Sequence, residues 1–346
     1  MSASRNVGVL AALGAALLFG VGTPAAKLLL EAASPWMLAG LLYLGSGAGL
    51  LVYRLARGAR PVRLSGAETG WLAAGVASGG VLAPVLLMWG LARMPAADAS
   101  LLLNAESVFT ALIAWFVFKE NFDRRIALGM LLIVAGAVLL SWPGQLRFGV
   151  VFPALAVVGA CWLWALDNNL TRKVALVDAS FIAMTKGLAA GATNVVLAWL
   201  AGAEMPVPAV VLAGALVGFA SYGASLVLFV VGLRHLGAAR TGAYFSTAPF
   251  AGALLALLLG DALTLQLAVA GALMAGGVWL HLTERHSHGH RHEPVEHEHA
   301  HVHDDHHRHD HSEPVPPGTQ HSHPHRHESL THAHDHFPDA HHRHEH

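Results

Sequence analysis

The chain consists mostly of long apolar runs separated by short polar linkers. Ten windows match the roughly 20 apolar residues that a helix needs to cross a bilayer. They cover residues 7–30, 36–55, 69–92, 97–118, 125–142, 148–170, 180–202, 208–233, 238–259 and 262–282. Each run is continuously apolar rather than alternating, which favours helices over a membrane β-barrel. The pattern predicts an all-α integral membrane protein with ten transmembrane helices.

Both ends of the chain depart from this pattern in their own way. The run at 7–30 is too long for the apolar part of a signal peptide and predicts a first membrane span. Residues 283–346 contain almost no large apolar side chains. Such a segment cannot bury enough apolar surface to offset the entropy of ordering. We therefore expect a disordered His-rich tail after the last span.

Composition and charge agree with a membrane region followed by a different tail. Hydrophobic residues make up 54% of the chain and charged residues 12%, against about 25% charged in soluble domains. Residues 1–282 hold 16 Lys or Arg and 10 Asp or Glu, a net charge of +6, whereas 283–346 hold 5 and 12, a net charge of −7. The basic residues are scattered over linkers, which argues against nucleic acid as a partner. The lone Cys161 excludes an internal disulfide.

The basic residues of the linkers predict the orientation in the membrane. With the N-terminus inside, inner segments hold 13 Lys or Arg and outer linkers hold only Arg93 and Arg147. Cytoplasmic segments of membrane proteins carry this excess. We expect a multi-pass protein of the cytoplasmic (inner) membrane with both termini in the cytoplasm, and we interpret Arg172 and Lys173 as topology anchors.

The two halves of the membrane region resemble each other at a spacing of about 142 residues. Gly45 and Gly49 match Gly187 and Gly191, and Gly129 matches Gly271. Five spans per half is an odd number, so the second half is expected to lie inverted. We predict one five-helix repeat at 7–142 and another at 148–282, an arrangement typical of transporters. Small residues four apart, including Gly75/Gly79 and Gly214/Gly218, predict close helix packing.

Four stretches carry a resemblance to a known family. They are LLFGVGTPAAK at 17–27, LARMPAADASLLLNAESVFTALIAWFVFKENF at 91–122, WALDNNLTRK at 164–173 and GLRHLGAARTGAYFSTAPFAGALLALLLGDALTLQLAVAG at 232–271, with Glu120 and Asp261 after spans 4 and 9. Over about residues 7–282 the chain resembles the drug/metabolite transporter superfamily of the EamA type. The resemblance implies Pro in the middle of both those spans. Pro249 agrees, whereas Ser107 departs from it. The family resemblance implies a carrier and names no substrate.

Glu106 is the first candidate for chemistry inside the membrane. It lies about nine residues into the fourth span, near the middle of the bilayer. An ionised carboxylate there costs roughly 3 kcal/mol or more, so it needs a proton, a cation or a hydrogen-bond donor. One interpretation is proton coupling or contact with a substrate amine. The other is a structural carboxyl bonded to Asn104, Ser107 or a neighbouring helix.

A row of polar residues, Asp167, Asn168 and Asn169, ends the sixth span. Lys186 enters the seventh span about six residues from the same side. The two spans are consecutive and antiparallel, so Asp167 and Lys186 are expected to share a depth and can form an ion pair that lowers the cost of both charges. A structural pair and direct contact of Asp167 and Asn168 with substrate or ion both stay open.

Further polar positions have both a structural and a functional interpretation. Asn104 and Asn194 lie in mid-span, where each can bridge helices by hydrogen bonds or face a cavity. Tyr244 can line a pocket or pack between helices. Pro24 after Thr23 removes a backbone hydrogen bond and is a candidate kink or gate.

The tail holds 23 of the 25 histidines, in blocks at 286–292, 297–303, 306–311, 321–327, 332–336 and 341–346. Alternate residues of an extended chain share a face, so two imidazoles can converge on one ion. Imidazole is a good ligand for Zn and Ni. We predict divalent metal binding by His286, His288, His290, His292, His297, His299, His301, His303, His321, His323, His325 and His327. A cytosolic metal buffer or sensor, and a solvated tail without a role, are the alternatives.

The sequence favours a transport function. No phosphate-binding loop or catalytic triad is found, so an enzyme is not expected, and no cofactor is required. The first hypothesis is a secondary active transporter that moves a small solute, such as a metabolite, an amino-acid-like compound or a drug, by alternating access, as an exporter. The second is a divalent metal cation transporter for Zn, Ni or Co, with a metal-collecting tail. A membrane-anchored metal store is a third. The expected partners are the solute, the bilayer and divalent metal at the tail, with a homodimer left open.

Overall fold

A computed structural model describes residues 2–59, 61–118, 124–142, 148–174, 177–236, 241, 244–282, 287–291, 296–301, 321–326 and 331–335. By its internal contacts the chain divides into two units, Met1–Glu284 and Arg285–His346. Glu120, which the family resemblance singled out, lies outside the described residues.

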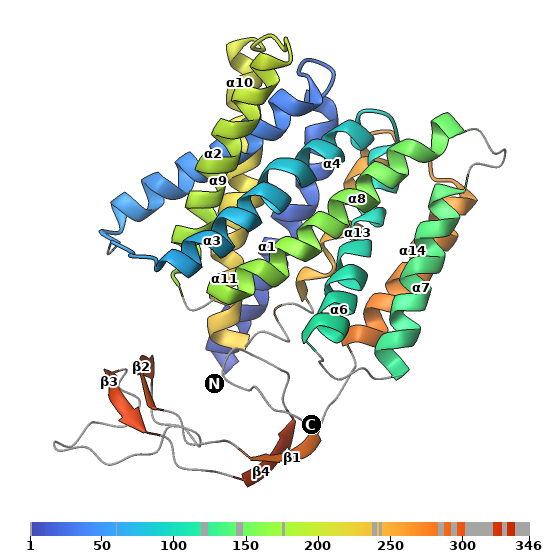
Figure 1. The fold of residues 1–346 in the computed structure, drawn as a ribbon. Helices are drawn as coiled ribbons and strands as arrows, with labels where there is room; N and C mark the ends of the chain where they lie inside the picture. The colour runs from blue at the N-terminus through green and yellow to red at the C-terminus, as the bar shows by residue number, and fades with distance from the viewer. Residues whose placement is uncertain are drawn as a thin grey trace. The chain divides into compact units, whose positions relative to one another are not determined.

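The described residues of the first unit form helices joined by short linkers (Figure 1). In its first half these are α1 (Ser2–Leu29), α2 (Pro35–Ala56), α3 (Gly66–Gly75), the π-helical segment η1 (Val76–Leu82), α4 (Ala83–Leu91), α5 (Ala96–Leu102), α6 (Ala105–Phe118) and α7 (Arg124–Ser141). The second half contains α8 (Phe148–Thr171), the 3₁₀ turn η2 (Arg172–Val174), α9 (Ala179–Leu200), α10 (Pro208–Gly218), the π-helical segment η3 (Phe219–Ala224), α11 (Ser225–Leu236), α13 (Ala248–Leu258) and α14 (Leu265–Leu282).

Six of these helical stretches are long and apolar enough to cross a membrane. They are Asn6–Leu29, Pro35–Ala56, Gly66–Leu91, Val151–Thr171, Ala179–Leu200 and Pro208–Gly232. Shorter apolar helices lie at Ala127–Ser141, Ala248–Leu258 and Leu265–Leu280. The prediction of a helical multi-pass membrane protein is confirmed, whereas the count of ten spans stays a prediction.

Local sequence signals set the helix ends. Ser34 accepts a hydrogen bond from the N–H of Met37 at the start of α2, and Ser65 with Glu68 forms a reciprocal capping box at the start of α3. These side chains satisfy N–H groups that have no partner within the helix. Gly202, at φ 81°, follows the end of α9, where a left-handed residue closes a helix.

Glycines bring the central helices into backbone contact. A Cβ on Gly187 of α9 would lie 2.6 Å from the backbone nitrogen of Gly47 in α2. On the other side of α2, a Cβ on Gly45 would overlap the backbone of Ala215 in α10, and one on Gly218 would overlap the carbonyl of Leu42. The close packing predicted from the small residues is therefore confirmed for α2 with α9 and α10.

Two kinds of irregularity occur in both halves at about the predicted spacing. The π-helical segments η1 and η3 begin 143 residues apart. The helices that follow are interrupted, at Leu103–Asn104 between α5 and α6 and at Ser246–Thr247 before α13. The predicted repeat places both pairs at equivalent positions, and the inverted repeat itself stays a prediction.

The Pro24 position does not interrupt its helix. Helix α1 continues through Pro24 to Leu29. Near that end, the ammonium of Lys27 donates a hydrogen bond of 2.6 Å to the carbonyl of Leu91, the last residue of α4. A cation is favourable at a helix C-terminus, where the carbonyl dipoles point outward.

The second unit contains four short strands, β1 (Ser287–Arg291), β2 (Glu296–His301), β3 (His321–Arg326) and β4 (Thr331–Asp335). β1 pairs with β4 and β2 with β3, both antiparallel (Figure 1). The prediction of a wholly disordered tail is wrong for these segments. Histidine alternates with other residues there, and this period of two is the period of a strand.

The glycine contacts give a matched test of packing. A Cβ on Gly218 meets backbone atoms of Leu42, whereas one on Gly70 of α3 meets nothing within 4 Å. We expect Gly70→Ala to stabilise the protein by about 0.5–1 kcal/mol because alanine favours a helix. Gly218→Ala should instead lower the unfolding temperature in detergent. Equal shifts of the two variants would contradict the packing described here.

Candidate functional site

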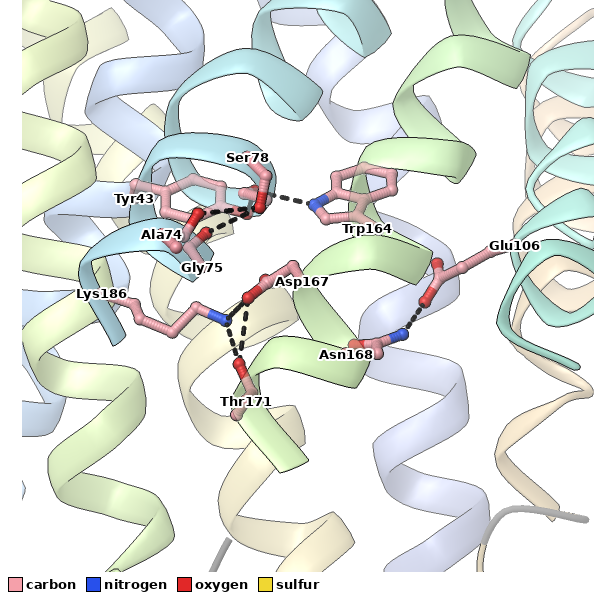
Figure 2. A network of polar contacts seen from close by, with 11 residues as sticks. Tyr43, Ala74, Gly75, Ser78, Glu106, Trp164, Asp167, Asn168, Thr171 and Lys186 are labelled. Atoms are coloured by element: carbon pink, nitrogen blue, oxygen red, sulfur yellow. Dashed lines mark hydrogen bonds and ion pairs between the residues drawn. The ribbon is translucent and has the colours of Figure 1, made fainter. Parts of the chain in front are cut away.

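The end of α8 sends three consecutive polar side chains in three directions. Successive residues of an α-helix are about 100° apart. Asp167 bonds to α9, Asn168 bonds to α6, and Asn169 donates to the carbonyl of Ala165 in its own helix at 2.8 Å. Figure 2 shows the first two contacts on opposite sides of α8. The row of polar residues therefore does not act as one patch.

Asp167 and Lys186 form the ion pair that their positions predicted. The ammonium of Lys186 lies 2.5 Å from Oδ2 and 2.7 Å from Oδ1 of Asp167. The Thr171 hydroxyl donates to Oδ1 at 3.0 Å and lies 3.2 Å from the ammonium (Figure 2). The side chains of Asp167 and Lys186 are 7% and 17% exposed. Each charge is therefore neutralised where water has little access.

Two glycines on the neighbouring helix make room for this carboxylate. A Cβ on Gly75 would lie 2.5 Å from Oδ1 of Asp167, and one on Gly79 would overlap the same carboxylate. The sequence predicted only helix packing for this pair. Their position opposite the acid could not be inferred from the sequence, because spacing along one helix does not identify what faces it.

The π-helical segment η1 leaves one backbone carbonyl near the ion pair for side-chain donors. At its end the N–H of Ala83 donates to the carbonyl of Ser78, and Pro84 has no N–H to donate. The carbonyl of Gly79 instead accepts from the indole N–H of Trp164 and from the Tyr43 hydroxyl, each at 2.9 Å. Trp164 and Tyr43 thereby fix the glycine turn that surrounds Asp167.

Asn194 joins three helical stretches. Its amide nitrogen donates to the carbonyl of Gly80 at 3.1 Å, and its amide oxygen accepts from the indole of Trp36 at 3.2 Å. The regular α-helical donor for Gly80 would be Pro84, which lacks an N–H. Asn194 is fully buried. Of the two predicted interpretations, these contacts match the helix bridge.

Glu106 lies directly after the interruption between α5 and α6. Its Oε1 accepts a hydrogen bond of 2.7 Å from the amide of Asn168 (Figure 2). Glu106 is half-buried and Asn168 is exposed. Among the described residues, Glu106 forms no ion pair, in contrast to Asp167. Among the described contacts, this carboxylate is thus held by one neutral donor.

Side-chain hydrogen bonds supplement the three-residue backbone hydrogen bonds at this interruption. Asn104 donates its side-chain amide to the carbonyl of Leu101 at 2.9 Å, and the Ser107 hydroxyl donates to the carbonyl of Asn104 at 2.7 Å. Asn104 is buried, 4% exposed. The break therefore forms without the proline that the family resemblance implied. The amide of Asn104 also lies 4.0 Å from the sulfur of Met274 in α14, and no described hydrogen bond joins it to Glu106.

An aromatic group spans the two halves beside η1. The Tyr43 and Tyr222 rings lie 5.5 Å apart, and Phe19 lies 5.8 Å from Tyr222 and 5.3 Å from Phe245. Of these four side chains, Phe19, Tyr43 and Phe245 were not among the residues predicted to form the site, whereas Tyr222 was considered as a pocket residue. Tyr244, which was predicted, accepts a hydrogen bond from the Thr247 hydroxyl through its carbonyl. Within the described residues, no contact joins its phenol to Glu106 or Asp167.

Arg54 links α2 to the start of α9. Its guanidinium lies 2.8 Å from Oδ1 of Asp178 and 2.6 Å from the Ser180 hydroxyl. Asp178 also caps α9 by accepting from the N–H of Phe181. Burial raises the pKa of Asp178, but the hydrogen bonds from Ser180 and Phe181 and the charge of Arg54 outweigh it and leave the pKa below the usual value. Arg54 thus closes one end of the α2–α9 contact.

The predicted metal ligands belong to the tail. Eight of them lie in strands: His288, His290, His297, His299, His301, His321, His323 and His325. His286, His292, His303 and His327 lie outside the described residues. Among the residues whose side chains are described, no group of three or more His, Cys, Asp or Glu is placed to hold a metal ion.

Apolar helices that enclose paired charges and bridging amides define an integral membrane protein with a polar interior. Known proteins place the chain more closely. The EamA-like transporter family model matches residues 6–142. A "probable 4-amino-4-deoxy-L-arabinose-phosphoundecaprenol flippase subunit ArnE" of Pseudomonas fluorescens is 38% identical over 104 residues, which cover 30% of this chain and 89% of that protein. The chain belongs to the EamA-like family of the drug/metabolite transporter superfamily.

Two further similarities extend over more of the chain. An "uncharacterized transporter" of Methanothermobacter thermautotrophicus is 31% identical over 209 residues, 58% of this chain and 60% of that protein. The match thus spans about three fifths of the archaeal relative. A crystal structure of another protein superposes with a TM-score of 0.60 at 23% identity and covers 79% of this chain and 94% of its own. That likeness shows a shared fold.

The ion pair predicts a specific pattern of stability changes. Asp167→Asn and Lys186→Met each leave one buried charge without its partner, and each should destabilise the protein by about 3–5 kcal/mol. The double variant removes both charges and should recover most of that loss. Denaturant unfolding of the purified protein in detergent measures the three values. Additive losses in the double variant would mean that the two charges do not interact.

Proposed function

We propose that the protein is a secondary active transporter that exports a small solute across the cytoplasmic membrane by alternating access. Membership of the EamA-like family supports a carrier. The observation that carries the proposal is the contact between Glu106 and Asn168, at the interruption between α5 and α6. Interrupted helices at mid-membrane are where secondary transporters bind substrates and coupling ions.

Glu106 suits a coupling role better than Asp167 does. Both oxygens of Asp167 are engaged by Lys186, so a ligand would have to break a buried ion pair. Glu106 has one described donor, the neutral amide of Asn168. Its carboxylate can take up a proton or a cationic group without displacing another charge. We therefore assign coupling to Glu106 and a positioning role to Asp167 and Lys186.

The chemistry of a lone carboxylate indicates the solute class. A carboxylate inside a membrane is stabilised by a proton or by a protonated amine, and one group cannot hold both. Occupation of Glu106 by either in turn exchanges protons for an amine solute and drives export. The name of the Pseudomonas relative describes a flippase for an amino-sugar lipid. An amine-bearing metabolite or amino-acid-like compound fits both considerations.

Contacts between the halves provide positions for alternating access. At one, Asp261 accepts a hydrogen bond of 2.8 Å from the N–H of Ala97. At another, Arg54 binds Asp178. With both termini in the cytoplasm, as the basic linkers favour, the first lies on the outer side and the second on the inner side. We propose that these contacts open in turn. The described residues give the metal-carrier alternative no support.

A comparison of secreted metabolites tests the proposal even though the solute is unidentified. We expect cells that overproduce the protein to release an amine-bearing compound, and cells with Glu106→Gln to release none above the empty-vector level. The matched control is Glu68→Gln, because Glu68 is a partly exposed capping residue of α3. Untargeted mass spectrometry of the medium makes the comparison. Wild-type release by Glu106→Gln would remove Glu106 from the mechanism.

A second prediction tests proton coupling through adjacent asparagines. Asn168→Ala removes a hydrogen bond to a charged group, which is worth about 1.5 kcal/mol. The midpoint of the pH profile of uptake into proteoliposomes should therefore shift by about one pH unit, a tenfold change in proton concentration. Asn169→Ala alters the same residue type on the next position, whose amide bonds only within α8 among the described contacts, and should leave that dependence unchanged. Solute flux under an imposed proton gradient is the measurement. Identical profiles for both variants would contradict the coupling role.

A further inference from the structure

The strand pairs of the tail place histidine opposite histidine throughout. In the β1–β4 pair, two such partnerships occur: His288 with His334 and His290 with His332. In the β2–β3 pair there are three: His297 with His325, His299 with His323, and His301 with His321. Every histidine within these four strands therefore has a histidine as its direct partner.

This register collects histidines that are far apart in the sequence onto shared faces. Direct partners and alternate residues of an antiparallel pair belong to the same face. One face of the β1–β4 pair thus carries four histidine positions, and one face of the β2–β3 pair carries six. A shift of one residue in either pair would place every histidine opposite another residue type. The observed register is the one that concentrates histidine positions on one face of each pair.

The remaining positions offer little to hold the strands together. The face opposite the four histidines carries Ser287, Gly289, Arg291, Thr331, Ala333 and Asp335. An isolated two-stranded pair is marginally stable even with an apolar face. The β2–β3 pair also closes a loop over residues 302–320, which costs chain entropy. Some other interaction across the strands is needed to stabilise the pairing.

Divalent transition-metal ions meet this need. Zn²⁺ takes four ligands and accepts neutral imidazole. When the ligands come from two strands, the free energy of metal binding contributes directly to the pairing of those strands. Histidine suits Zn²⁺, Ni²⁺, Co²⁺ and Cu²⁺, whereas Mg²⁺ prefers oxygen ligands. The net charge of −7 over residues 283–346 also favours cations.

We propose that divalent transition-metal ions bind across the paired strands and hold the tail as a hairpin within a hairpin. The inner hairpin is β2–β3 and the outer one is β1–β4, with the connections at 292–295 and 327–330. Binding within a single histidine block would need no partner strand. Binding across strands makes metal the cause of the pairing. This site is independent of the transport role proposed above.

Paired spin labels on the full-length protein in detergent test this proposal. In a Cys161→Ala background, Ala300→Cys and Ser322→Cys place labels at partner positions on the face without histidines. The sample is first stripped of metal with a chelator, and then Zn²⁺ or Mg²⁺ is added. We expect Zn²⁺ to produce dipolar broadening of the spectrum because the labelled residues become strand partners. Mg²⁺ should produce none, and the chelator should reverse the effect of Zn²⁺.

Two sets of substitutions with equal loss of histidine separate binding across strands from local binding. His321→Gln, His323→Gln and His325→Gln remove the β3 histidines and should abolish the broadening and weaken Zn²⁺ binding by about tenfold or more. The control His306→Gln, His307→Gln and His309→Gln removes three histidines outside the four strands and should retain the broadening. The proposal is overturned by broadening that persists in metal-free protein, by its absence when Zn²⁺ is bound, or by an equal effect of both sets.

Discussion

The buried ion pair between Asp167 and Lys186 constrains much of the membrane unit. A buried carboxylate needs a cation beside it. It also needs space on the facing helix, which a larger side chain at Gly75 or Gly79 would fill. Lys186 supplies the cation, and Gly75 and Gly79 leave the space. Helices α3, α8 and α9 therefore have to meet at one level and in one rotation. The aromatic and amide contacts around Gly79 and Gly80 hold that arrangement.

The sequence predicted the parts of this arrangement that follow from spacing. Apolar runs identified the helical membrane class, and the positions of Asp167 and Lys186 near one end of consecutive antiparallel helices gave their pairing as one of two interpretations. Glycines four apart predicted close packing between helices, without indicating which helices meet. Each of these inferences depends on one helix period or on one linker, which a sequence displays directly.

Other features depend on three-dimensional neighbours and could not be predicted in this way. The sequence around Asn168 does not show that it faces Glu106, because the two residues lie on different helices and are 62 positions apart. The π-helical turn at η1 depends on which backbone groups can pair, rather than on hydropathy. The carbonyl of Ser78 accepts from Ala83, and Pro84 has no N–H to donate. The paired strands of the tail were also missed, since low complexity was interpreted as disorder.

The π-helical segment η1 has an effect on the phase of its helix. Five-residue spacing of the hydrogen bonds accommodates an additional residue, and each added residue turns the following part of a helix by about 100°. Helices α3 and α4 both turn a glycine toward α8 across this segment: Gly75 of α3 faces Asp167, and Gly90 of α4 packs against Val157. A deletion of one residue within Val76–Leu82 would rotate these surfaces out of alignment without changing a single contact residue. The length of this stretch is consequently as much a part of the site as its side chains.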